Sequence, residues 1–201
     1  GVIGEGDVQW MTAGSGILHK EYHEADFARQ GGDFHMIQLW VNLPAKDKMT
    51  EPKYQAIENR EFGKFKLEGD LGFVEVVAGA FNGVKGPATS FSPVEIYIAH
   101  VKSGAKLDFS LAPNYNTGIV NLEGSLRIND SDNVPVDNFV LFANDGSDFT
   151  VEALADSKYF ILSGKPLHEP IASRGPFVMN TEEEIRQAMR DYGTGKFGHL
   201  E

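Results

Sequence analysis

The sequence contains no cysteine, and this absence excludes disulfide bonds, thiolate metal sites and cysteine nucleophiles. It also has no apolar run near 18 residues and no visible signal sequence, so it predicts no membrane-spanning helix. Positive charge is scarce: 18 Lys and Arg stand against 29 Asp and Glu, and the net charge of -11 disfavours nucleic acid and anionic membranes as direct partners. We therefore expect a cytoplasmic protein, which would also be nuclear in a eukaryote.

Sustained helical periodicity is scarce as well, whereas turn-forming and β-favouring residues are plentiful. The 201 residues include 22 Gly, 9 Pro and 14 Phe, and 41% of them are hydrophobic. This composition is typical of a globular all-β protein. No alternation of strands with helices is visible, which argues against a parallel, doubly wound sheet.

The N-terminal part contains three strand-like stretches. Short strands are predicted at Val8–Thr12 and Ile17–Tyr22, joined by a turn of Gly14, Ser15 and Gly16. The apolar stretch His35–Pro44 alternates between two faces and predicts a third strand. The charged segment that follows predicts a domain boundary near residues 45–60.

The central part predicts a second all-β unit with turn residues between its strands. Short strands are expected at Phe73–Val77, Val94–Val101, Lys106–Leu111, Gly118–Leu122, Ser125–Ile128, Asn138–Leu141, Phe149–Ala153 and Lys158–Leu162. Strands of this length and spacing predict a sandwich or a small barrel.

One helix is predicted, at residues 181–192 near the C-terminus. Thr181 and Glu184 have the spacing of a capping box, and an apolar stripe at helical spacing is expected to pack against a barrel. The predicted organisation is therefore residues 1–55, residues 56–167 and a tail of residues 168–201 that carries this helix.

His19 and Glu21 are the candidate site residues. On a strand, positions i and i+2 point to the same side, roughly 7 Å apart along the chain. An imidazole and a carboxylate that converge in this way suit a divalent metal ion, although two ligands alone do not hold one. The alternative from spacing alone is a surface histidine and glutamate on an edge strand.

Several strings resemble the pirin family of the cupin superfamily, essentially from end to end. They are Gly16-Ile17-Leu18-His19, which matches the glycine, two residues and ligand histidine of a cupin motif, and the longer stretches QWMTAGSGILHKE, HMIQLWVNLP, EPKYQ and GPFVMNTEEEIRQA. The resemblance implies a bicupin, with two antiparallel β-barrels of which the first holds a metal. It implies that His19 and Glu21 are two ligands of a site with three histidines and one glutamate, which binds Fe(2+), with Mn, Ni, Zn or Cu as alternatives.

The family's other two ligands form an H-x-H pair, which occurs nowhere in this chain. We expect these two histidines upstream of Gly1, so that the first barrel is incomplete here and the chain by itself is inactive, with or without bound metal. Truncation of a longer pirin is the favoured explanation over a separate N-terminal piece or a partner chain that completes the barrel. In the second barrel, Asn114 and Asn116 lie at or near the histidine positions, and asparagine is a weak ligand for these metals.

For the other histidines and for several neighbouring residues, the sequence predicts only a general location. His23 is expected on the surface, His35 in the core or at the rim, and His100 and His168 in structural roles. Gln38 reaches either a metal cavity or solvent. The walls of such a cavity could include Trp10, Met11 and Ile17, with core packing as the alternative.

The resemblance implies a flavonol dioxygenase of the quercetinase type, an oxidoreductase of the EC 1.13.11 class, acting on a small aromatic flavonol-like substrate. In this reading Glu21 is both a metal ligand and the base for the flavonol hydroxyl. One alternative is a non-enzymatic regulator, a transcriptional cofactor that acts through protein partners. Another is a barrel that binds a small molecule without chemistry.

Overall fold

The structure is a computed structural model and describes residues 1–200. By its contacts the chain divides into two units. The first is residues 1–56 together with the chain from Leu167 onward, and the second is Ile57–Pro166. Within residues 1–200 no helix combines the length and the apolar character needed to cross a membrane.

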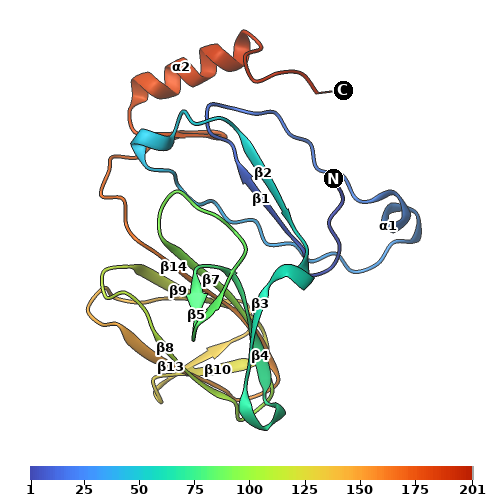
Figure 1. Cartoon of the computed structure of the whole chain (residues 1–201), viewed down its shortest axis with the longest axis vertical. Helices are drawn as coiled ribbons and strands as arrows, with labels where there is room; N and C mark the ends of the chain where they lie inside the picture. The colour runs from blue at the N-terminus through green and yellow to red at the C-terminus, as the bar shows by residue number, and fades with distance from the viewer. Residues whose placement is uncertain (201) are drawn as a thin grey trace. The chain divides into compact units, whose positions relative to one another are not determined.

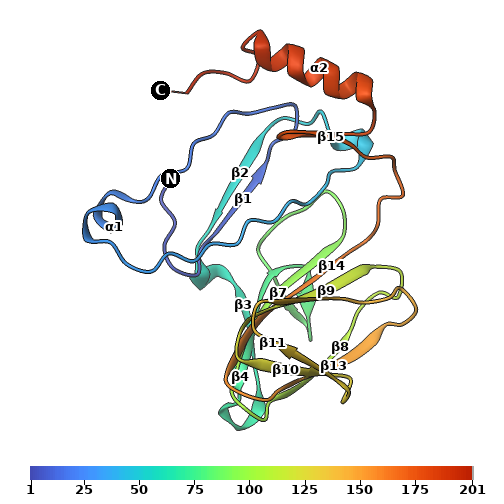
Figure 2. The same cartoon turned by 180° about the vertical axis from the view of Figure 1, so that it is seen from behind.

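The second unit is a cupin-type barrel of two antiparallel sheets (Figures 1 and 2). One sheet has the strand order β12-β9-β14-β7-β4-β3, and the other has the order β11-β10-β13-β8. Their strands are β3 (Gly63–Lys66), β4 (Gly72–Ala78), β7 (Val94–Val101), β8 (Lys106–Ser110), β9 (Asn116–Glu123), β10 (Ser125–Ile128), β11 (Asp132–Pro135), β12 (Asn138–Leu141), β13 (Asp148–Ala153) and β14 (Ser157–Gly164). A hairpin of β5 (Ala80–Phe81) and β6 (Val84–Lys85) and two 3-10 helices, η2 (Asn59–Glu61) and η3 (Glu68–Asp70), complete this unit.

The core of this barrel lies between the two sheets. Strands alternate sides, so one face of each contributes apolar residues while the other faces outward. On β14 the buried residues alternate with half-buried ones along the whole strand. Ile119 and Ile161 from the larger sheet and Leu126 from the smaller one are fully buried in the same cluster. The all-β prediction is therefore confirmed, and all eight strands predicted in this part are present.

The first unit contains less regular structure. Its elements are β1 (Val8–Thr12), α1 (Ala25–Gln30), the 3-10 helix η1 (Ala45–Asp47), β2 (Lys53–Ile57, whose last residue belongs to the second unit), β15 (Ala172–Arg174), β16 (Phe177–Met179) and α2 (Glu182–Gly193). Its strands form two pairs, β1 with β2 and β15 with β16. The described residues of this unit thus form two separate strand pairs and no closed barrel.

Two strands predicted in this unit are wrong. Ile17–Tyr22 and His35–Pro44 are both without strand pairing, and β1 pairs instead with β2 far along the chain. An alternating pattern identifies side chains that share a face, but a strand also requires a neighbour for its backbone hydrogen bonds. The large apolar side chains of the second stretch remain exposed, with 65% exposure for Trp40 and 52% for Met36. The short helix α1 lies between these two stretches.

The C-terminal segment is part of the first unit. The Glu169 carboxylate accepts a hydrogen bond of 2.7 Å from the backbone N–H of Ala45, at the start of η1. Nearby, the buried Lys48 donates to the Asn42 side chain over 2.6 Å. Burial lowers the pKa of Lys48, and the charges of Glu169 and Glu184 partly oppose this shift. These contacts join residues 42–48 to the chain after Leu167.

Candidate metal centre

The turn before His19 is held in place by its backbone. The N–H of Ser15 donates to the carbonyl of Thr50 over 2.8 Å, and the N–H of Gly16 donates to the carbonyl of Ala13 over 2.9 Å. Gly14 has a φ of 51°, and a Cβ at this position would overlap the Thr50 carbonyl. Glycine is therefore required for the turn to approach Thr50 so closely.

His19 and Glu21 lie side by side after this turn. The distance from His19 Nδ1 to Glu21 Oε1 is 3.8 Å. Their side chains are 46% and 45% exposed, so neither is sealed in a core. The two residues converge although they lie on a segment without helix or strand. Their convergence is the feature that the sequence predicts; the strand from which it was inferred is absent.

The two side chains lie close enough together to contact one metal ion. Two donors that each bind an ion at about 2.1 Å lie about 3 Å apart at a right angle and about 4.2 Å apart when opposite each other. The distance of 3.8 Å between the two atoms falls within this range. An imidazole nitrogen with a carboxylate oxygen is a donor set that suits iron, manganese, nickel or zinc.

Residues 1–200 bring no third ligand to this pair, since they contain no group of three or more His, Cys, Asp or Glu residues placed to hold a metal ion. His23 packs its ring against Phe27 and Phe34, with centroid distances of 5.6 and 4.9 Å. His35 and Gln38 are exposed. Within residues 1–200 the pair is therefore a set of two candidate ligands.

The residues considered as cavity walls have mixed environments. Trp10 and Met11 on β1 are half-buried, whereas Ile17 is 39% exposed. In the second unit, Asn116 accepts a hydrogen bond of 2.7 Å from the side chain of Asn144, and Asn114 is exposed.

A polar cluster around the buried Glu75 in the second unit was missed from the sequence. Glu75 accepts hydrogen bonds from Asn59, Lys64 and His100, and the first of these donors lies 16 residues away along the chain. No sequence motif joins the four residues, because strand register brings Lys64 and His100 to Glu75, and Asn59 comes from the 3-10 helix η2. The sequence pointed to this cluster only through β4, where the charged Glu75 lies between two buried valines, Val74 and Val76.

The fold of the second unit and the His19–Glu21 pair after a glycine turn define a protein of the cupin class. A family model described as the pirin C-terminal cupin domain matches residues 96–198, and a model described as pirin matches residues 1–41. The chain belongs to the pirin family.

Individual relatives agree with this assignment. A Pseudomonas aeruginosa protein named, provisionally, as a quercetin 2,3-dioxygenase is 42% identical over 197 residues, which cover 98% of this chain and 68% of the relative. Human pirin is 34% identical over 202 residues, covering 98% of this chain and 67% of its own length. A crystal structure of quercetin 2,3-dioxygenase from Acinetobacter baumannii has a TM-score of 0.95 and 42% identity, covering 99% of this chain and 69% of that one.

Proposed function

We propose that the protein is a metal-dependent dioxygenase that acts on a flavonol such as quercetin. The observation that carries the proposal is the pairing of His19 with Glu21 at 3.8 Å, both accessible, after the glycine turn. The similarity to proteins named quercetin 2,3-dioxygenase supports the reaction class. In this proposal His19 and Glu21 are two of the ligands of the metal.

A bound Fe(2+) would supply open coordination positions and the redox chemistry that dioxygen needs. The residues of this chain would bind the metal and accept a proton. His19 binds as a neutral imidazole, and Glu21 places a carboxylate where it can accept the proton of the flavonol hydroxyl. A carboxylate within hydrogen-bond reach of the reacting hydroxyl is the geometry that general-base catalysis requires.

The experiment uses the whole protein, loaded anaerobically with iron(II) and mixed with quercetin under oxygen. The proposal predicts loss of the flavonol absorbance by the wild type and a strong decrease of this rate in Glu21→Gln. Glu51→Gln is the matched control, because it removes an exposed carboxylate elsewhere in the same unit. Retention of the flavonol absorbance by a protein with confirmed metal occupancy would contradict the proposal.

The second candidate is a regulatory protein that binds metal and protein partners without turnover. The exposed apolar side chains of residues 34–41 favour it, because large accessible apolar surfaces often mark interaction sites. The same assay distinguishes the two proposed functions, since a regulator would bind iron and leave quercetin unchanged.

A further inference from the structure

The C-terminal segment contacts the turn that precedes His19. Gly16 has a φ of 121°, and a Cβ built on it would overlap the ring of Phe197. The ring therefore packs directly on the backbone of this turn, three residues before His19. Figures 1 and 2 show the chain after α2 passing near the segment that follows β1. Gly16 and Phe197 belong to the same unit.

Phe197 is held by two other aromatic residues. Its ring centroid lies 6.1 Å from that of Phe177 on β16 and 6.2 Å from that of Tyr192 on α2. The rings of Phe177 and Tyr192 are themselves 6.5 Å apart. Aromatic rings at these distances attract each other through offset and edge contacts, so the three rings form one cluster.

The backbone before Phe197 is fixed to the end of α2. The N–H of Lys196 donates to the carbonyl of Asp191 over 3.0 Å, and its ammonium group donates to the carboxylate of the same residue over 2.6 Å. This hydrogen bond holds the pKa of Asp191 below its usual value. Gly195, with a φ of 75°, donates to the carbonyl of Tyr192 over 3.0 Å. The chain therefore leaves the helix in one defined direction.

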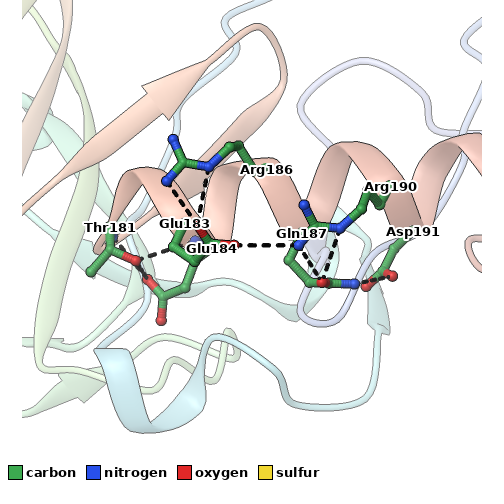
Figure 3. A network of polar contacts seen from close by, with 7 residues as sticks. All are labelled: Thr181, Glu183, Glu184, Arg186, Gln187, Arg190 and Asp191. Carbon is green, nitrogen blue, oxygen red and sulfur yellow. Dashed lines mark hydrogen bonds and ion pairs between the residues drawn. The ribbon is translucent and has the colours of Figure 1, made fainter.

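Helix α2 is in turn well defined. Thr181 and Glu184 form a capping box at its start, and Ile185 is buried on its inner side. Figure 3 shows the polar side chains along the helix, where Arg190 bonds to Gln187 over 2.6 Å and Gln187 bonds to Asp191 over 2.7 Å. Asp191, which holds Lys196, is thus itself held by contacts with the neighbouring side chains of the helix.

We propose that Phe197 is a positioning residue for the pair His19 and Glu21. Its ring restricts the turn at Gly16 and so limits the positions from which His19 can point toward Glu21. The consequence for metal binding rests on the function proposed above, whereas the restriction of the turn does not. Ligand geometry depends on the groups that support the ligands, and loss of such a support typically weakens metal binding by roughly tenfold or more.

A first test measures whether the contact between Gly16 and Phe197 affects the stability of the fold. Gly16→Ala introduces a Cβ that meets the Phe197 ring, together with strain from the positive φ, and should lower the urea midpoint of unfolding. In a Phe197→Ala background the strain remains but the overlap is gone, so Gly16→Ala should lower the midpoint by less. Equal shifts in both backgrounds would overturn the contact between ring and turn.

A second test follows His19 by NMR in the metal-free protein. Phe197→Ala should shift the imidazole resonances of His19 and increase the backbone mobility of residues 17–21 in ¹⁵N relaxation. Phe197→Leu, which keeps part of the apolar volume, should lie between Phe197→Ala and wild type. Phe91→Ala, at an exposed phenylalanine of the other unit, is the matched control and should leave these signals unchanged. A folded Phe197→Ala with wild-type His19 signals and mobility would overturn the proposal.

A third measurement connects the positioning to the metal. In the whole protein, titration with manganese(II) should give an affinity roughly tenfold weaker for Phe197→Ala than for wild type, with Phe197→Leu between them. If wild type binds no metal while the NMR differences persist, the proposed function fails and the positioning stands. If wild type and Phe197→Ala bind manganese(II) equally, the positioning role fails while the metal site stands.

Discussion

Glu75 and His100 lie 3.2 Å apart, from Oε2 to Nε2, on the neighbouring strands β4 and β7. The other oxygen of Glu75 accepts hydrogen bonds of 2.8 Å from both Asn59 and Lys64. The ring of His100 stacks on Phe73, its direct partner in the strand register, with 4.7 Å between centroids. A carboxylate with 5% exposure is therefore fully supplied with donors.

These contacts make the stability of the second unit depend on pH in the acidic range. Burial alone would raise the pKa of Glu75, but hydrogen bonds from His100, Lys64 and Asn59 and the charge of His100 lower it to about 2. A carboxyl group whose pKa is lower in the folded state stabilises the fold above its unfolded pKa. This stabilisation, at most about 3 kcal/mol, should be lost as the pH falls from about 4.5 to about 2.

The measurement is urea unfolding of wild type and Glu75→Gln at several pH values. Near pH 7 the variant should be less stable, and the difference should shrink as the pH falls toward 2. Glu123→Gln, at an exposed carboxylate of the same unit, should track the wild type throughout. A difference between wild type and Glu75→Gln that stays constant from pH 5 to pH 2 would refute this assignment.

Phe109 joins two other aromatic rings of the barrel core. It is 1% exposed, and its ring centroid lies 5.1 Å from those of both Phe81 and Phe149. Phe109→Ala should therefore lower the free energy of unfolding by about 3–5 kcal/mol, because it removes a buried ring and leaves a cavity. In denaturant unfolding Phe91→Ala should change it by less than about 0.5 kcal/mol. Similar losses for both variants would mean that the aromatic core is not as described.

Thr181 caps helix α2. Its hydroxyl accepts a hydrogen bond of 3.2 Å from the N–H of Glu184, whose carboxylate accepts one of 2.8 Å from the N–H of Thr181. Thr181→Ala should cost about 1 kcal/mol, whereas Thr181→Ser should retain most of the stability. Hydrogen exchange of the first-turn amides provides the measurement, and equal exchange in Thr181→Ala and wild type would argue against the cap.

The sequence predicted much of the second unit because its strands carry local signals. Val94–Val101, Ser125–Ile128 and Asn138–Leu141 have the bounds predicted for them, since turn residues flank each run. The very short β5 and β6 were missed because two residues are too few to show alternation. Helix α2 begins after Thr181, as the capping pattern predicts.

The first unit was predicted less well because its contacts are distant in sequence. The partner of β1 is β2, and the turn at Gly16 meets Phe197 from the other end of the chain. Neither relationship follows from periodicity. His19 and Glu21 were expected to share one face of a strand; they do lie 3.8 Å apart, but on a segment that forms no strand. The cluster around Glu75 depends on a register between strands and had no comparable local signal.

The central claim is that His19 and Glu21 bind one metal ion. The most direct measurement is the iron(II) affinity of the whole protein, determined anaerobically for wild type, His19→Ala, Glu21→Gln and the control Glu51→Gln. Each of the two ligand variants should bind more than about tenfold more weakly, since loss of a ligand should cost at least as much as loss of its support. The control should bind like wild type. Unchanged iron(II) affinity in both His19→Ala and Glu21→Gln would contradict the claim.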